Sequence, residues 1–255
     1  MTNSTTAHKN RTIRLWAVLL WLLIWQAFSM YIGQEILLAS PLAVLLRLGQ
    51  LLLESDFWQA VWFSLRRIAT GFLLAMTAGV LLAALAAHAR RVEELLAPIM
   101  LFVKATPVAS FIILVLIWVN SRNLSVIISF LMVWPIMYTN VLAGIKATDK
   151  KLLEMADIFE IPRLKRLTHI YVSQVLPHFE AACLVGLGLC WKSGIAAEVI
   201  GIPTGSIGER LYTAKIYLAT PDLFAWTLTI ILLSVGFEKL FMCLLRAVIA
   251  RVERA

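Results

Sequence analysis

Three charged side chains lie inside long apolar stretches of the sequence, where an ionised group is costly. Lys104 stands in FVKATPVAS, and Lys192 and Glu198 stand in LCWKSGIAAEVIG. An ionisable residue in such a setting is by default a candidate for contact with an ion or solute. Residues six apart on a helix point about 120° away from each other. Lys192 and Glu198 are therefore not expected to pair with each other.

Each charged residue also has an interpretation that involves no solute. Lys104 can extend its stem to a membrane surface, and Lys192 and Glu198 can meet a neighbouring helix or lipid headgroups. Both interpretations stay open. Four more residues share the solute-path hypothesis, because they allow a kink or lie deep in an apolar run beside a proline or a charge. They are Thr106, Pro107, Trp134 and Trp191.

The other reactive side chains form no recognisable site. The four histidines show neither H-x-x-x-H nor H-E-x-x-H spacing, the usual signatures of a zinc site on a helix. The three cysteines lie in apolar runs, where we expect small reduced hydrophobes. The sequence contains no G-x-x-x-x-G-K-[ST] loop to cradle ATP phosphates. We therefore expect no metal, cofactor or catalytic residue in this chain.

The composition explains why charged residues are exceptional here. The 255 residues are 61% hydrophobic and only 15% charged, with a mean hydropathy of +0.85, against about 45–50% and about 25% in soluble domains. The apolar residues form blocks near the roughly 17–25 residues that span a bilayer. The blocks are Leu15–Ile32, Ile68–Ala87, Ala97–Val119, Leu124–Ile145, Leu176–Ala197 and Leu223–Ala247. We expect an all-α polytopic membrane protein with about six transmembrane helices.

The first block follows Lys9, Arg11 and Arg14, as the apolar core of a secretory signal would. It is longer than such a core, and no clean small-x-small cleavage site follows, so we expect a retained helix. The expected organisation is a tail at 1–14, the first helix and an outer segment at 15–56, a transmembrane core at 57–248 and a tail at 249–255.

The basic residues predict the orientation, because Lys and Arg gather in cytoplasmic loops. With the N-terminus inside, 14 of them fall on the cytoplasmic side, and only Arg47, Arg122, Arg210 and Lys215 fall in outer loops. Arg66 and Arg67 are expected at the outer interface. Both termini are predicted to be cytoplasmic. The net charge of +8 then follows from topology and does not indicate nucleic acid.

The densest polar segment, KATDKKLLEMADIFEIPRLKRLTHI at 146–170, joins the fourth and fifth blocks on the predicted cytoplasmic side. Leu152, Met155, Ala156 and Phe159 recur at helical spacing, and Pro162 can end that helix and start another. We expect a short amphipathic helix, a bend and a second helix. Its apolar stripe suits a groove on a partner, whereas a solvated loop is the alternative.

This segment resembles the EAA loop of ABC importer permeases. Glu154-Met155-Ala156 followed by Leu176-Pro177 fits the family pattern without a gap, with Glu160 where the family usually has glycine and Ser173 where proline is common. Further stretches resemble the nitrate/sulfonate/taurine branch. They are ASPLAVLLRLGQLL, SLRRIATGFLLAMTAGVLLAAL, APIMLFVKATPVASFIILVLIWV and IAAEVIGIPTGSIGERL.

The resemblance implies a type I ABC importer (MetI-like) transmembrane domain in a bacterial inner membrane. It also implies a second permease copy, two cytoplasmic ATPase subunits that use ATP and Mg²⁺, and an extracytoplasmic solute-binding protein. The solute would be a small anion such as a sulfonate, taurine or nitrate, with a vitamin precursor or another small organic solute as the alternative. The coupling segment, 146–169, would meet the ATPase through Glu154, Met155, Ala156, Asp157, Phe159, Glu160 and Pro162.

The outer segment GIPTGSIGERLYTAKIYLATP begins with turn residues and continues with Ile207, Leu211, Ala214 and Leu218 at helical spacing. A short helix here could act as an outer gate, with Gly205, Ile207 and Gly208 at its start, or could be a plain surface helix. Two other classes rank lower. A secondary transporter would show an inverted repeat, and an integral membrane enzyme would need a chemical constellation; neither is evident.

Overall fold

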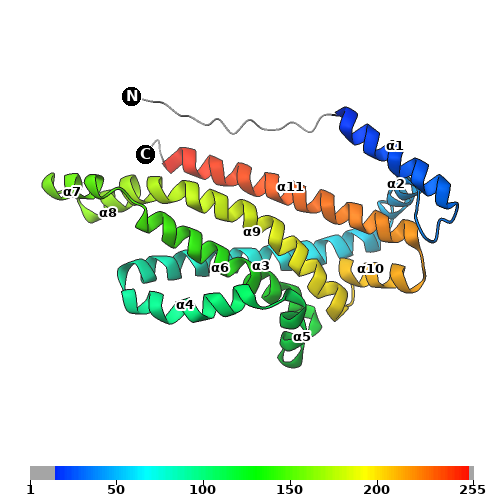
Figure 1. Cartoon of the computed structure of the whole chain (residues 1–255), viewed down its shortest axis with the longest axis horizontal. Coiled ribbons are helices and arrows are strands. Elements are labelled where there is room, and N and C mark those ends of the chain that lie inside the picture. Colours follow the sequence, from blue (N-terminus) through cyan, green and yellow to red (C-terminus); the bar gives the residue numbers. More distant parts are fainter. Residues whose placement is uncertain (1–14, 253–255) are drawn as a thin grey trace.

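The computed structural model describes residues 15–252, so the predicted tail at 1–14 and residues 253–255 of the other tail lie outside the described residues. Within that range every regular element is helical, as expected (Figure 1). The elements are α1 (Leu15–Ile32), α2 (Pro41–Leu51), α3 (Ser55–His88), α4 (Arg90–Ala105), α5 (Val108–Trp118), η1 (Ser121–Asn123), α6 (Leu124–Lys146), α7 (Lys150–Ile158), α8 (Arg163–Arg166), η2 (Leu167–Tyr171), α9 (Val172–Gly201), α10 (Ile207–Ile216) and α11 (Thr220–Val252).

Five helical runs in the described residues are long and apolar enough to cross a membrane, and α4 with α5 makes a sixth if that bent pair is one span. The apolar block at Ala97–Val119 is divided between two helices, because α4 and α5 meet at an angle of 108°. Pro107 lacks an amide hydrogen and forces the residue before it out of the helical region. Thr106 accordingly adopts an extended conformation, with φ −80° and ψ 130°.

The bent pair carries the chain from one end of the bundle to the other. At the first end, Glu93 of α4 binds Lys146 at the end of α6, with a shortest oxygen–nitrogen distance of 2.5 Å. Beyond α5, the carbonyl of Arg122 accepts a hydrogen bond from Arg67 in the first half of α3. The pair thus connects opposite ends, as a single broken span does.

Helices α3, α6 and α9 form the centre of the bundle, and α11 runs beside them (Figure 1). Two glycines of α3 permit its close approach to α6. A Cβ at Gly71 would lie 2.4 Å from the carbonyl oxygen of Val126, and one at Gly79 would lie 2.5 Å from the Cβ of Met137. Small residues at such contacts let helices pack backbone to backbone, which favours association within a membrane.

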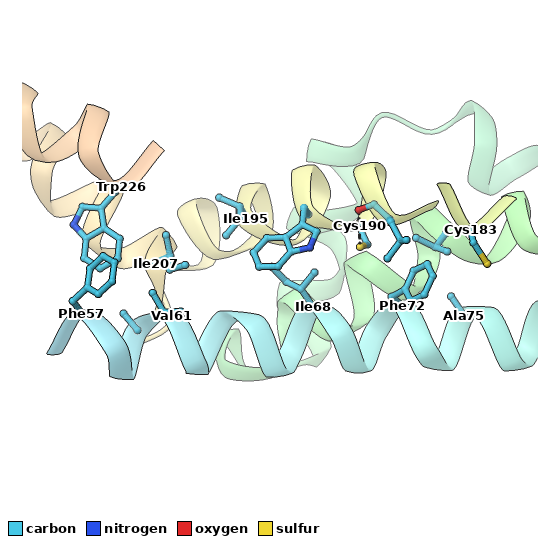
Figure 2. Close-up of a cluster of buried hydrophobic side chains, with 14 of the residues drawn as sticks. Phe57, Val61, Ile68, Phe72, Ala75, Cys183, Cys190, Ile195, Ile207 and Trp226 are labelled. Carbon is cyan, nitrogen blue, oxygen red and sulfur yellow. Dashed lines mark hydrogen bonds between the residues drawn. The ribbon is translucent and has the colours of Figure 1, made fainter. Parts of the chain in front are cut away.

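An apolar cluster follows α3 from Phe57 to Ala75 and joins it to α9, α10 and α11 (Figure 2). Phe72 is fully buried in this cluster. Phe57 stacks on Trp226 of α11 with a centroid distance of 5.0 Å. These contacts fix the end of α11 that lies beside α10.

Helix α1 touches the bundle only through part of its surface, and none of its residues is buried. Trp25 lies 5.5 Å, ring to ring, from Phe224 of α11. The following outer segment contains α2, which the sequence analysis did not predict. Ser40 caps α2 by accepting from the amide of Ala43 at 3.2 Å, and Pro41 is its first residue. This Ser-Pro pair is a recognisable helix start.

Candidate coupling segment and pathway residues

The predicted amphipathic helix of the coupling segment is present as α7, with Asp149 as its N-cap residue. The Asp149 side chain accepts from the amide of Lys151 at 2.9 Å. The predicted apolar stripe divides between two surroundings. Ala156 is completely buried and Leu152 is half-buried, whereas Phe159 is 72% exposed. The stripe therefore both anchors α7 and presents apolar surface outward.

The outward surface of α7 includes a residue that the stripe omitted. Ile158 is 78% exposed and stands with Met155, which is 44% exposed, and Phe159. Glu154 is exposed as well. Helix α7 and its C-cap residue thus carry an exposed carboxylate and three exposed apolar side chains at one end of the molecule (Figure 1).

The helix ends in a left-handed turn at Glu160, whose φ is 49°. The amide of Ile161 donates to the carbonyl of Ala156 at 2.9 Å, and the amide of Glu160 donates to Asp157 at 3.1 Å. This pair of bonds is the Schellman arrangement, which usually places glycine at the left-handed position. The predicted bend is therefore confirmed, with a glutamate where glycine is favoured.

Ion pairs hold both sides of the coupling segment. Arg166 binds Asp157 and so ties α8 to α7, and Lys146 binds Glu93 at the end of α6. Pro162 directly precedes α8, as its predicted role as a helix starter requires. A π-helical turn, η2, then leads into α9. The segment is thus a bend whose two helices are tied together, with an ion pair to α4 at its start.

Lys104, Thr106 and Pro107 lie at or next to the break between α4 and α5. The Nζ of Lys104 donates to the hydroxyl of Thr139 on α6 at 3.4 Å, and both Lys104 and Pro107 are exposed. The Thr106 hydroxyl donates to the carbonyl of Phe102 at 2.8 Å. The break therefore places the charge of Lys104 and the ring of Pro107 on the surface of this chain.

The two tryptophans of the path hypothesis have different surroundings. Trp191 is 1% exposed, and its ring meets Phe237 of α11 at 6.2 Å. Trp134 is half-buried and stacks on Phe130 at 5.6 Å. Lys192 follows Trp191 on α9 but is exposed. Trp191 thus belongs to the packed interior of this chain, and Lys192 faces its exterior.

Glu198 is completely buried where α9, α3 and α10 meet. The hydroxyl of Ser64 on α3 donates to its Oε2 at 2.6 Å, and the amide of Gly208 donates to the same oxygen at 3.4 Å. The amide of Ile207 donates to the Ser64 hydroxyl at 3.0 Å. The structure therefore brings one path candidate, Glu198, together with two candidates for the outer gate.

The loop before α10 also has a defined conformation. Gly205 adopts φ +80°, a value that favours glycine, and its amide donates to Oε2 of Glu209 at 2.6 Å. The predicted helix is confirmed as α10. The proposed stripe is wrong at Leu218, which lies beyond the helix, has a φ of 54° and is 64% exposed.

Sequence analysis missed the ion pairs at the α10 end. Arg47 of α2 binds Asp222 of α11 at 2.6 Å, and Arg210 binds Asp56 at 3.2 Å. Burial opposes the charge of Arg47, but the hydrogen bond and charge of Asp222, helped by Glu54, outweigh it and raise the pKa of Arg47. These partners are 175 and 154 residues apart in sequence, so no local pattern could reveal them.

Within residues 15–252 no group of three or more His, Cys, Asp or Glu side chains is arranged to hold a metal ion. The polar groups instead serve helix ends, ion pairs and hydrogen bonds between helices. What the arrangement offers is an apolar bundle with one projecting polar segment and a short helix tied across its opposite end.

A comparison with protein families decides the identity. Residues 75–254 match the family described as the binding-protein-dependent transport system inner membrane component. The match covers more than half of the chain and includes the coupling segment, the α4–α5 break and α10. The chain belongs to this family.

Individual relatives of this permease are distant but cover most of it. A putative aliphatic sulfonates transport permease, SsuC of Bacillus subtilis, is 25% identical over 79% of this chain and 74% of that protein. The nitrate import permease NrtB of Synechococcus elongatus is 23% identical over 76% and 73%. The riboflavin transport permease RibX of Chloroflexus aurantiacus is 26% identical over 88% and 86%.

The permease is therefore a multi-pass inner-membrane component of an ABC transporter and is not itself a catalyst. Membership of a binding-protein-dependent system implies an ATPase and a binding protein as partners. The predicted all-helical membrane fold and the family assignment are both confirmed.

Proposed function

We propose that this permease forms the solute path of an ATP-driven importer. Two copies would enclose the path, and each would bind one ATPase subunit through the coupling segment at 146–169. A binding protein would deliver the solute at the α10 end. The excess of basic residues around the α7 end supports a cytoplasmic location for that end and for both termini.

The observation that carries this proposal is the surface of α7. Met155, Ile158 and Phe159 are exposed at α7, which the buried Ala156 anchors and the ion pair of Asp157 with Arg166 ties to α8. An amphipathic helix with outward apolar anchors suits a groove on a partner. A rigid docked helix can also transmit the preference of an ATP-bound partner for one packing of the spans.

Co-purification tests the proposal. The permease is tagged at its C-terminus in its own cell, extracted in mild detergent and analysed by mass spectrometry. We expect a stoichiometric chain that carries a P-loop. Repeated isolation of folded permease alone would contradict the proposed docking of an ATPase on this chain.

A matched pair of variants then tests the docking surface. Phe159→Ala and Tyr217→Ala each truncate one exposed aromatic side chain, at opposite ends of the molecule (72% and 78% exposed). We expect Phe159→Ala to release the ATPase and Tyr217→Ala to retain it. Retention by both variants would contradict docking through this face of α7. Phe159 is a better target than Ala156, because Ala156 is buried and an Asp there would disturb α7 itself.

For the solute, we propose a small anion of the sulfonate, taurine or nitrate class. Two of the relatives are named for aliphatic sulfonates and for nitrate. Lys104 and Lys192 are exposed on this chain and would suit an anion if they face a second copy. The relative named for riboflavin keeps a vitamin or its precursor as the alternative.

A further inference from the structure

The carboxyl group of Glu198 is enclosed by three helices and has no open surface. Glu198, Ser64 and Ile207 are each 0% exposed. Ser64 both donates to the Glu198 carboxylate and accepts from the amide of Ile207, so its hydroxyl bridges α9 and α10 from α3. A group placed in this way cannot contact a solute unless the helices first separate.

The hydrogen bonds converge on the first residues of α10. Amides in the first turn of a helix have no partner within the helix, and three of them are satisfied here by side chains. The amide of Ile207 donates to the Ser64 hydroxyl, and the amide of Gly208 donates to the Glu198 carboxylate. The amide of Glu209 donates to the Ser206 hydroxyl at 3.0 Å. A carboxylate is favoured at this position, because the N-terminus of a helix carries partial positive charge. The start of α10 is therefore tied to both α3 and α9.

Steric fit adds to these bonds. A Cβ at Gly208 would lie 2.3 Å from the Cβ of Glu198 and 2.4 Å from its carbonyl carbon. Glu198, Ser64 and the amides of Ile207 and Gly208 together form a clasp. At this clasp, helices α9 and α10 touch backbone to backbone. Any movement of α10 away from α9 must break these hydrogen bonds.

Oε1 of Glu198 faces the hydroxyl of Ser125 on α6, and neither atom has another hydrogen-bond partner among the described residues. A buried carboxylate oxygen with so few partners costs free energy that contact with water would restore. The hydrogen bonds of Ser64, Ile207 and Gly208 thus stabilise the closed arrangement, whereas Oε1 of Glu198 would gain partners when the clasp opens.

We propose that the clasp holds α10 closed across α3 and α9, and that it opens when this end of the bundle opens during transport. Glu198 is then a positioning residue for α10 and not a ligand of the solute. The holding of α10 stands on the geometry alone, whereas its opening during transport rests on the proposed importer function.

Hydrogen–deuterium exchange of the full chain in detergent tests whether the clasp holds α10. Loss of hydrogen bonds to a buried carboxylate should speed exchange of the 207–216 amides by about tenfold or more in Glu198→Ala and Ser64→Ala. The double variant should resemble the single ones, because the groups act as one unit. Glu198→Gln should stay near the parent rate, because its amide oxygen still accepts from Ser64. Glu180→Ala, on the other half of α9, is the control.

Unchanged exchange of α10 in Ser64→Ala would overturn the proposal. Because Ser64→Ala removes only one hydroxyl, it keeps the test valid even if Glu198→Ala fails to fold.

The opening step is tested with the co-purified ATPase. Ser64→Ala should raise ATP hydrolysis without binding protein several-fold, because weakening a contact made only in the closed state shifts the population toward the open one. A looser α10 with an unchanged rate would overturn the opening step. If no ATPase co-purifies with the parent chain, the proposed function is contradicted. The hydrogen–deuterium exchange result still tests whether the clasp holds α10.

Discussion

Glu160 shows how one residue can set the shape of the coupling segment. Its left-handed φ of 49° costs a residue with a Cβ roughly 1–2 kcal/mol. Glycine would avoid that cost, but would lose about 0.5–1 kcal/mol through its greater freedom in the unfolded chain. The first effect is the larger one, so glycine should be the more stable choice at this position.

We therefore expect Glu160→Gly to tighten the end of α7 by about 0.5–1 kcal/mol. The amide of Ile161, which donates to Ala156, should exchange with deuterium more slowly, by roughly two- to fivefold. Glu154→Gly is the matched control inside α7, where glycine should loosen the helix by about 1 kcal/mol. Faster exchange at Ile161 in Glu160→Gly would show that the glutamate side chain contributes more than its backbone strain costs.

The two exposed lysines of the path hypothesis are tested as a pair. Replacing Lys104 and Lys192 by Met keeps the stem lengths and removes both charges. We expect assembly with the ATPase to persist and uptake of radiolabelled taurine or nitrate, whichever the parent transports, to fall about tenfold or more, since an anion loses charge-assisted contacts. Lys239→Met on α11 is the control for loss of an exposed lysine. Parent-level uptake in the double variant would remove both lysines from the path.

At the scale of helices, close packing predicts different effects of adding a methyl group at two glycines, Gly208 and Gly188. Gly208 has no room for a Cβ against Glu198, whereas a Cβ at Gly188 on α9 would meet nothing within 4 Å in this chain. Gly208→Ala should displace α10 and destabilise the permease by about 1–3 kcal/mol. Gly188→Ala should be neutral or stabilising by up to about 1 kcal/mol. Thermal unfolding in detergent compares them. A loss confined to Gly188→Ala would place that face of α9 against a second copy and contradict the packing argument.

Local signals in the sequence predicted the elements that are themselves local. The spacing of Leu152 and Ala156 and the position of Pro162 were sufficient for α7 and its bend, because helix periodicity and proline act within a few residues. The contact of Ser64 with Glu198 was not predictable in the same way. It joins residues 134 apart, and the sequence of one helix does not say which helix its polar residues will face.

The α4–α5 break depends both on a local signal and on contacts with distant helices. Proline chemistry at Pro107 indicated that a kink was permitted, yet hydropathy alone made Ala97–Val119 a single block. The bend of 108° also reflects the burial of Phe111 and Ile112 against other helices, at 7% and 0% exposure. Packing of that kind depends on the whole bundle and leaves no mark within the segment.

For the molecule as a whole, the α4–α5 pair decides the topology. If the pair crosses the membrane, the chain has six spans and both termini lie on the same side. If the pair turns back, the chain has five spans and the termini lie on opposite sides. The structure favours crossing. Before the break, Glu93 of α4 binds Lys146 at the end of α6. Beyond α5, the carbonyl of Arg122 accepts from Arg67 in the first half of α3, away from the end of α3 that leads into α4.

Labelling with a membrane-impermeant maleimide tests this topology in the full chain, in a variant whose three native cysteines are replaced by serine. Single cysteines are placed at His88, Asn123, Phe159 and Tyr217, which are all exposed, and at Ala255. Because the basic residues gather at the α7 end, we expect Asn123→Cys and Tyr217→Cys to react in intact cells with a permeabilised outer layer. His88→Cys, Phe159→Cys and Ala255→Cys should react only after the inner membrane is opened. Tyr217→Cys is the control for the side of Asn123, because two spans, α6 and α9, separate these sites whatever the pair does. Labelling of His88→Cys together with Asn123→Cys in intact cells would mean that the pair turns back, and the shared cytoplasmic side of the termini would then be wrong.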